Sequence, residues 1–284
     1  MNETLTKFRE ETTTRIIEAI KAGTAPWQRP WNGSYGAQNA ISHRLYNGIN
    51  QILLMFEGMK IDGGTDPRWL TFKQASDNGW KVKKGSKGTH VTLWKPIIKA
   101  KENELDDDEV LGVMQRVFTV FHASQIDGIS EYKPVQPNEI KSHERAEQII
   151  TNSKAKINYG GNEAFYSPSG DYIQLPVKSD FKSTESYYST ALHELVHWTG
   201  HSSRLDRKLE DYHIAKNNRA FEELIAEIGS MFVSCEAGIQ QSEGEFQNHA
   251  SYVDGWISYL EKDSNAIFKA AAQASKAADF LLKA

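Results

Sequence analysis

Apolar residues recur at helical spacing near the start of the chain, which predicts an amphipathic helix over residues 2–22. Its apolar positions are Leu5, Phe8, Ile16, Ile17 and Ile20, and Gly23 follows as a C-terminal stop signal. Residues 48–56 predict a short buried helix. Thr71 is placed to cap another short helix that ends near Gly79.

Two apolar, β-branched stretches, 89–98 and 113–121, predict a pair of strands. The acidic run at 101–109 predicts a solvated loop between them. Residues 163–176 predict a second hairpin, which turns at residues 168–171.

The second half of the chain is mostly helical in pattern. Helices are predicted at 142–152, 184–200, 218–237, 249–261 and 265–282, with Ser264 as a cap for the last one. Proline, glycine and weak periodicity place a linker at 131–141. The pattern therefore predicts an α+β protein of two domains, residues 1–130 and 142–284.

Composition narrows the class of protein. The 284 residues are 39% hydrophobic and 25% charged, which is typical of a globular protein, and no apolar run reaches the ~20 residues needed to span a membrane. The polar N-terminus has no signal-peptide pattern, and the single cysteine, Cys235, excludes a disulfide framework. We therefore expect a cytoplasmic protein without a membrane partner.

Charge is distributed unevenly along the chain. Residues 1–100 hold 15 lysines and arginines against 8 acids, whereas residues 101–284 hold 18 against 29. Five of the seven tryptophans also lie in the first 94 residues. A basic, tryptophan-rich half joined to an acidic half indicates two separate tasks.

The most specific chemical motif is H-E-x-x-H at residues 193–197. His193 and His197 are four residues apart, so both imidazoles lie on one helical face and can reach one metal ion. Glu194 is placed to deprotonate the attacking water and to pass the proton to the leaving amine. This pattern predicts a zinc-dependent hydrolase, and a peptidase in particular.

A catalytic zinc needs a third protein ligand. His201 is on the same helical face, but three ligands along one straight helix cannot surround a metal. Ser203 occupies the position where the metzincin pattern has its third histidine. We therefore expect His201 to be a second-layer or structural residue.

The next helix offers better candidates for the third ligand. Glu223, Glu227, Ser230 and Ser234 share one face that carries no lysine or arginine, and Gly229 would allow close helix approach. We expect Glu223 to bind the metal and Glu227 to orient a histidine, with the reverse assignment as the main alternative.

Two further features bear on a peptidase. Residues 171–176 suit an edge strand that could hold an extended peptide by strand addition. Side chains that could donate to a tetrahedral oxyanion are Tyr187, Tyr188, Tyr252 and His201.

Aromatic and cationic side chains alternate in the first half of the chain, as single-strand binding requires for base stacking and phosphate contact. The alternative is that the aromatics form a core and the lysines are solvated. The aromatics include Phe72 and Trp94, and the candidate DNA contacts are Trp27, Arg29, Trp31, Arg44, Tyr46, Arg68, Trp69, Lys73, Trp80, Lys83, Lys84 and Lys87.

These motifs together resemble the ArdC-type antirestriction proteins of conjugative plasmids, over nearly the whole chain. The resemblance rests on residues 26–31, 46–50, 69–75, 83–94, 171–176, 193–205 and 222–227. It implies an α+β N-terminal domain that binds single-stranded DNA, and a mostly helical zincin-like metallopeptidase domain with a small sheet. It also implies protection of incoming DNA from restriction, and its Glu-x-x-x-acid spacing favours Glu223 as ligand.

Two functions from different classes follow. The first is a bifunctional protein that binds single-stranded DNA and cleaves an unidentified protein, for which a component of the restriction system is one candidate. Its cofactor would be Zn²⁺, with Mn²⁺ or another divalent ion possible in vitro. The second is a DNA-coating protein with a structural or vestigial metal site. A nuclease is less favoured, because the only dense acidic run reads as an exposed loop.

Overall fold

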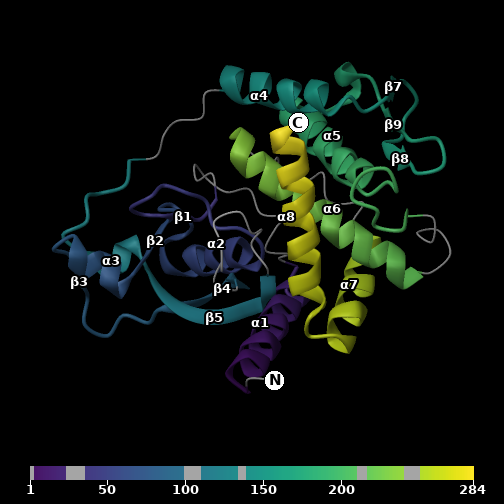
Figure 1. The fold of residues 1–284 in the computed structure, drawn as a ribbon. Helices are drawn as coiled ribbons and strands as arrows, with labels where there is room; N and C mark the ends of the chain where they lie inside the picture. The colour runs from purple at the N-terminus through teal and green to yellow at the C-terminus, as the bar shows by residue number, and fades with distance from the viewer. Residues whose placement is uncertain (1–2, 24–35, 99–109, 134–138, 210–215, 240–249) are drawn as a thin grey trace, which may run out of the picture.

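The computed structural model describes residues 3–23, 36–98, 110–133, 139–209, 216–239 and 250–284 (Figure 1). Its helices are α1 Glu3–Lys21, α2 Ile49–Asp62, α3 Phe72–Asp77, α4 Glu139–Ser153, α5 Thr184–Thr199, α6 Lys216–Ala237, α7 Ala250–Lys262 and α8 Ala266–Lys283. Its strands are β1 Gln38–Asn39, β2 Arg68–Thr71, β3 Lys81–Val82, β4 Thr89–Ile98, β5 Val110–His122, β6 Ile126–Asp127, β7 Ile157–Tyr159, β8 Phe165–Ser167 and β9 Tyr172–Leu175. The predicted acidic loop at 101–109 and residues 134–138 of the predicted linker lie outside the described residues.

The N-terminal half is built on a four-stranded sheet with the order β1-β2-β5-β4. β1 and β2 are parallel and the other neighbours antiparallel, with Trp69 opposite His122 and Thr89 opposite Val120. Trp69, Val91 and Val120 are buried and belong to the main hydrophobic core. The antiparallel pairing of β4 with β5 confirms the predicted strand pair.

α3 follows β2 directly and begins with a capping box. Thr71 Oγ1 accepts from the Gln74 N–H at 3.2 Å, and Gln74 Oε1 accepts from the Thr71 N–H at 2.9 Å. The helix ends at Asp77, and Gly79 follows in the left-handed region with φ of 74°. The predicted cap and short helix are thereby confirmed.

α2 covers part of the open edge of β4. Asn50 Nδ2 donates to the Thr92 carbonyl at 2.6 Å, and Asn50 Oδ1 accepts from the Thr92 N–H at 2.8 Å. The side-chain amide thus takes the hydrogen bonds that a neighbouring strand would make. α2 is longer than predicted and ends at Asp62, because Gly63 supplies a left-handed cap with φ of 75°.

The C-terminal half contains a three-stranded sheet with the order β7-β9-β8. β8 and β9 are antiparallel, which confirms the predicted hairpin, and β7 adds a parallel strand that the sequence pattern did not predict. The expectation that residues 171–176 form a free edge strand is wrong, because β7 and β8 occupy both sides of β9. β7 has only three residues, too few for an alternating pattern to be recognised.

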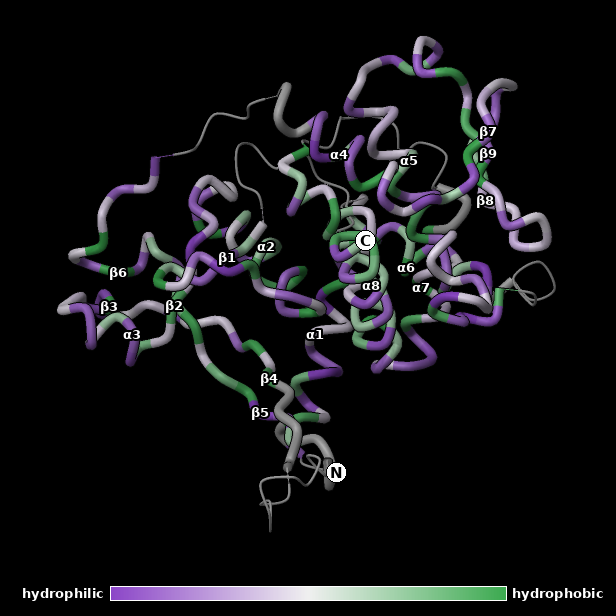
Figure 2. Tube along the Cα trace, turned by 45° about the horizontal axis from the view of Figure 1, so that its top comes forward, coloured by the Kyte–Doolittle hydropathy of each residue, from purple (hydrophilic) through white to green (hydrophobic). Residues whose placement is uncertain are grey.

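The predicted helices of the second half are confirmed, with shifts of a few residues at their ends. Figure 2 shows hydrophilic and hydrophobic residues alternating along α1 and α8, as expected for helices with one buried face. Small side chains let α8 lie close to α6; they are Ala266, Ala270, Ala271, Ala274, Ala277 and Ala278, all buried.

The predicted cap of α8 at Ser264 is wrong. Asn265 occupies the N-cap position, and its N–H donates to Asp263 Oδ1 at 2.8 Å. The Ser264 carbonyl instead accepts from Thr13 Oγ1 at 2.8 Å, which ties α1 to the start of α8.

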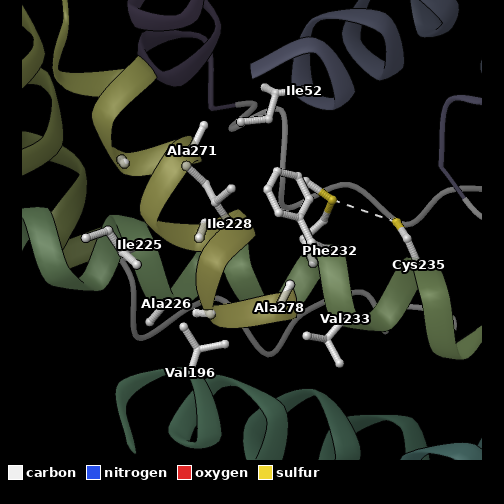
Figure 3. Packing of buried hydrophobic residues seen from close by; sticks show 14 of the residues in the cluster. Ile52, Val196, Ile225, Ala226, Ile228, Phe232, Val233, Cys235, Ala271 and Ala278 are labelled. Carbon is white, nitrogen blue, oxygen red and sulfur yellow. Dashed lines mark hydrogen bonds between the residues drawn. The ribbon is translucent and has the colours of Figure 1, made fainter. Parts of the chain in front are cut away.

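The two halves share one hydrophobic core. Phe8 of α1 packs edge-to-face on Phe268 of α8, with ring centroids 6.0 Å apart. Figure 3 shows Ile52 of α2 beside Phe232 of α6 and Ala271 of α8. The first helix is therefore packed on the C-terminal half although it precedes the N-terminal sheet.

The α+β architecture with a sheet-based N-terminal part and a mostly helical C-terminal part is confirmed. The division at residues 131–141 stays a prediction. In the described part of the chain no helix combines the length and the apolar character that crossing a membrane requires.

Candidate metal centre

α5 carries the H-E-x-x-H motif and begins with a side-chain cap. Ser183 Oγ accepts from the Ser186 N–H at 3.1 Å, as an N-cap serine does. His193 and His197 lie one turn apart, and their rings pack edge-to-face with centroids 4.8 Å apart. Both imidazoles therefore point to the same side of the helix.

α6 brings a glutamate to this pair of histidines. Glu223 Oε2 lies 3.5 Å from His193 Nε2 and 3.6 Å from His197 Nε2, and the two Nε2 atoms are 3.2 Å apart. We call His193, His197 and Glu223 the triad. Their potential ligand atoms all lie within 4.8 Å of one another, so one ion could contact all three.

A glycine permits this approach of α6 to α5. A Cβ atom on Gly229 would lie 2.9 Å from Val196 Cγ1, closer than real Cβ contacts allow. The face of α6 that carries Glu223, Glu227 and Ser230 is buried, so it is not a solvated face.

Each histidine has a second carboxylate at its other ring nitrogen. Glu227 Oε1 lies 3.4 Å from His193 Nδ1, and Glu222 Oε1 lies 3.1 Å from His197 Nδ1. A carboxylate at neutral pH only accepts, so Nδ1–H of His197 donates to Glu222. In the neutral imidazole that metal binding requires, that tautomer leaves the Nε2 lone pair directed into the triad.

The carboxylates control the charge state of the histidines. Burial alone would lower the pKa of His197, but Glu222 and Glu223 outweigh it and raise the pKa to about 10. Burial also opposes the shift of His193, whose pKa is nevertheless raised by Glu223 and by the charges of Glu227 and Glu194. The contacts with both histidines hold the pKa of Glu223 far below its usual range in spite of burial.

These residues fit a divalent metal ion. Two imidazole nitrogens and one carboxylate oxygen form the donor set of many catalytic zinc sites, and manganese accepts the same donors. A buried cluster of carboxylates also requires a counter-charge, which a divalent cation supplies. Glu194, 8% exposed, directly follows His193 on α5 and so lies between the two histidines of the triad.

Other residues considered for the centre lie outside the triad. His201 Nδ1 bonds to Ser203 Oγ at 2.8 Å, in the turn that follows α5. The Tyr187 hydroxyl contacts Tyr159 at 3.2 Å, and the Tyr188 hydroxyl donates to Glu147 at 2.9 Å. These contacts engage both hydroxyls within the C-terminal half, and the side chain of Tyr252 lies outside the described residues.

Comparison with known proteins places this centre in a family. A family profile described as a zincin-like metallopeptidase matches residues 144–273, and one described as the N-terminal domain of anti-restriction factor ArdC matches residues 6–121. Two crystal structures of the antirestriction ArdC protein from plasmid R388, metal-free and Mn(II)-bound, are 34% identical to this chain. Their TM-scores are 0.77 and 0.76, and the matches cover 97% of this chain and 96% and 97% of theirs.

The chain belongs to the ArdC family of antirestriction proteins. The uncharacterized protein y4eC of Sinorhizobium fredii is 32% identical, over 98% of this chain and 92% of its own length. Two Escherichia coli proteins named DNA primase TraC are 43% and 42% identical over 99% and 97% of this chain. The match spans only 28% and 20% of those primases, so this ArdC-type chain corresponds to less than a third of their length.

In the ArdC-type N-terminal region, the structure separates surface residues from core residues among the predicted DNA contacts. Arg44, Lys73, Lys83, Lys84 and Lys87 are exposed. Lys73 pairs with Asp77, and Lys83 donates to the Ser124 carbonyl at 2.7 Å. These five cations are accessible to a ligand.

Other predicted DNA contacts are partly or fully inside the protein. Trp69 is 1% exposed in the main core, so the prediction that it stacks on DNA is wrong. Trp69 lies on the face of β2 that packs into the core, so its ring is not accessible to a nucleic-acid base. Arg68 bonds to Asp66 and to the Ser130 carbonyl.

Tyr46 and Trp80 are half-buried. The Tyr46 hydroxyl lies 3.5 Å from Asn39 Nδ2, and Trp80 packs against the small cluster under α3. The remaining predicted contacts, Trp27, Arg29 and Trp31, and the side chain of Trp94 lie outside the described residues.

The sequence did not single out three residues that lie near these two sites. Phe72 is 63% exposed at the start of α3, a position where an aromatic residue is more often core. Glu222 and Arg207 stand behind His197, and the only sequence signal was the acid next to Glu223.

Proposed function

We propose that the chain is a metal-dependent peptidase with Zn²⁺ as its ion, held by His193, His197 and Glu223, and with Glu227 orienting His193. The observation that carries the proposal is the convergence of three ligand atoms from two helices beside Glu194. The zincin-like match over residues 144–273 supports it.

In the proposed peptide hydrolysis, the metal ion and the chain's own residues contribute different steps. When bound, such an ion lowers the pKa of a coordinated water to about 7 and polarises a carbonyl. Glu194 accepts a proton from the attacking water at its carboxylate and returns it to the leaving amine nitrogen. Glu222 and Glu227 keep the imidazoles in the tautomer that presents Nε2.

The substitution Glu194→Gln tests this role. It should leave metal affinity intact and lower cleavage of a peptide library, followed by mass spectrometry, by about 10²- to 10⁴-fold. The matched control is Glu236→Gln, an exposed acid on α6, which should cleave like the unmodified chain. A Glu194→Gln protein that cleaves at full rate would rule out general-base catalysis by Glu194.

We further propose that the N-terminal half binds single-stranded DNA on a surface around α3. Asn39 Nδ2 donates to Gln74 Oε1 of α3 at 3.3 Å. This bond holds the turn after Asn39 beside α3, and Arg44 follows that turn. β3 also packs on α3, and the exposed Lys83 and Lys84 directly follow β3 in the chain. Exposed cations around an exposed ring provide phosphate contact and base stacking without a recognition helix.

Phe72→Ala tests the DNA surface. Loss of one stacked base costs about 1–3 kcal/mol, so affinity for a single-stranded oligonucleotide should fall by about 5- to 150-fold. Tyr159→Ala is the matched control, because Tyr159 is an exposed aromatic on β7, 54% exposed, in the other half of the molecule. Affinity should also fall with added salt, and equal binding of duplex DNA would contradict the proposal.

The biological role that follows is protection of incoming DNA from host restriction, with a protein as the peptidase substrate. The alternative is that DNA coating alone protects and the metal centre is structural. Transfer of unmodified plasmid DNA into restricting recipients separates the two, because Glu194→Gln should abolish protection only if proteolysis is used. Full protection by Glu194→Gln together with loss of protection by Phe72→Ala would establish the coating alternative.

A further inference from the structure

Behind His197 stands a buried ion pair between Arg207 and Glu222, and Glu222 is the member that bonds to His197. Arg207 Nε donates to Glu222 Oε2 at 3.0 Å, and Arg207 Nη2 donates to Glu222 Oε1 at 2.7 Å. The side chains of Arg207 and Glu222 are 5% and 6% exposed. The two parallel bonds fix the plane of the carboxylate whose Oε1 faces His197 Nδ1 at 3.1 Å.

The same guanidinium is anchored to the end of α5. Arg207 Nη2 donates to the Val196 carbonyl at 2.7 Å, and Nη1 donates to Thr199 Oγ1 at 2.8 Å. Arg207 therefore joins the helix that carries His197 to the carboxylate on α6 that orients it.

The backbone is shaped to deliver this side chain. A Cβ atom on Gly200 would lie 2.7 Å from Arg207 Nη2, although Gly200 has an ordinary helical conformation with φ of −78°. A side chain at this position would therefore displace the Arg207 guanidinium from where it stands. Asp206 and Lys208, on either side of Arg207, adopt left-handed φ values of 48° and 57°, which side-chain-bearing residues rarely do. Such strain persists where the surrounding structure enforces it.

We propose that Arg207 is a positioning residue for the metal centre, acting through Glu222 to hold His197 with Nε2 toward the ion; this rests on the proposed metal-binding function. Its charge also offsets one of four neighbouring carboxylates, those of Glu194, Glu222, Glu223 and Glu227. Without it, Glu222 would be an uncompensated buried anion free to turn away from His197.

The turn after α5 offers a matched control for Arg207. Arg204 is also largely buried, 10% exposed, and it holds the same turn through Asp171, the Tyr166 hydroxyl and the Trp198 carbonyl. It contacts neither the triad nor Glu222 among the described contacts. A purely structural role for these arginines would make the two substitutions equivalent for metal binding.

The experiment is a titration of the full chain with Mn(II), in which free Mn(II) is measured by electron paramagnetic resonance. The parent is compared with the variants Arg207→Gln, Glu222→Gln and Arg204→Gln. Loss of a partner that orients a ligand weakens metal affinity by about 10- to 100-fold. We expect that loss for Arg207→Gln and Glu222→Gln, and affinity within twofold of the parent for Arg204→Gln.

Equal Mn(II) affinity of the parent, Arg207→Gln and Glu222→Gln would overturn the positioning role while leaving the metal centre intact. An equal loss for Arg204→Gln and Arg207→Gln would overturn it as well. If Arg207→Gln does not fold, the Mn(II) affinity of Glu222→Gln compared with that of Arg204→Gln decides whether the positioning role holds. A parent chain that binds no Mn(II), or a His193→Ala chain that binds as the parent does, would instead remove the metal centre on which the inference rests.

Discussion

Gly229 determines how closely the helix that carries Glu223 approaches the helix that carries both histidines. The substitution Gly229→Ala would set a methyl group 2.9 Å from Val196 Cγ1. Overpacking of this kind costs about 1–3 kcal/mol, and moving α6 away from α5 should also weaken metal binding. Urea unfolding and metal titration of the variant measure the two effects.

Gly58 provides the control for that prediction. It is also buried in a helix, but a Cβ there would meet Trp69 Cζ2 at an ordinary 3.8 Å. Gly58→Ala should therefore be neutral or stabilising, since alanine is favoured over glycine in helices by about 0.5–1 kcal/mol. Equal destabilisation by the two substitutions would show that space at Val196 is not the reason for Gly229.

The pairing of Asp171 with Arg204 predicts a pH dependence of stability. Hydrogen bonds from Arg204, opposed by partial burial, hold the pKa of Asp171 below its ordinary value of 3.8. A depressed carboxyl pKa stabilises the folded chain above the unfolded pKa, and this stabilisation is lost as pH falls through the folded value.

Asp171→Asn should therefore reduce the free energy of unfolding at pH 6 and flatten its decrease below about pH 4. Urea unfolding between pH 3 and pH 6 measures this. In an Arg204→Gln background the same substitution should change the pH profile little, because the partner is already absent.

At the scale of single residues, the sequence predicted the triad and the place of Glu227 beside it, but not Glu222 and Arg207 behind His197. Helical spacing fixes His193 and His197 on one face, and a cation-free acidic face on the next helix pointed to Glu223. Arg207 could not be predicted, because its position depends on a turn that folds back on α5 through Gly200. Trp69 was misassigned since the two faces of a four-residue strand cannot be told apart before the sheet is known.

The capping box of α3 is a feature of a whole element with a measurable effect. Thr71→Ala removes the hydroxyl that accepts from the Gln74 N–H, and should cost about 0.5–2 kcal/mol. Because the cap fixes the first turn, which presents Phe72, affinity for single-stranded DNA should decrease with it. Thr151→Ala, on the exposed side of α4, is the control and should change unfolding by less than about 0.5 kcal/mol.

Elements with long periodic patterns were predictable, as were short ones with a cap or turn signal such as α3, whereas the three-residue β7 was not. α5, α6 and α8 are long enough for an apolar face to be recognised. β7 is recognised only through its pairing with β9, which depends on tertiary contact. That missing strand is why β9 was taken for an edge; among the described strands of this sheet, the edges are β7 and β8.

At the scale of the whole molecule, the packing of α1 on α7 and α8 joins the two functional halves. Phe8, Ile16 and Ile20 of α1 are buried in the same core as the helices of the metal centre. We therefore expect the chain to unfold in one cooperative transition. Metal binding in the C-terminal half should then stabilise the N-terminal half too.

Hydrogen exchange with and without Mn(II) tests this coupling. At a free ion concentration 100-fold above Kd, stability should rise by about 2.7 kcal/mol, and amides of α2 should be protected together with those of α5. Protection confined to α5 and α6 would contradict a single cooperative unit. The Glu194→Gln chain serves as a control with an intact metal centre and should behave like the parent.

The two hydrogen bonds between the Asn50 side chain and the Thr92 backbone affect how separate copies of the chain can meet. The open edge of an outer strand is a template for pairing with another polypeptide, and such pairing is a common route to aggregation. On β4 the amide of Asn50 already occupies both backbone groups of Thr92. Pro96, four residues further along the same side of the strand, has no N–H to offer. The outer edge of β4 is thus blocked at Thr92 and at Pro96, which should disfavour its pairing with a strand of another copy.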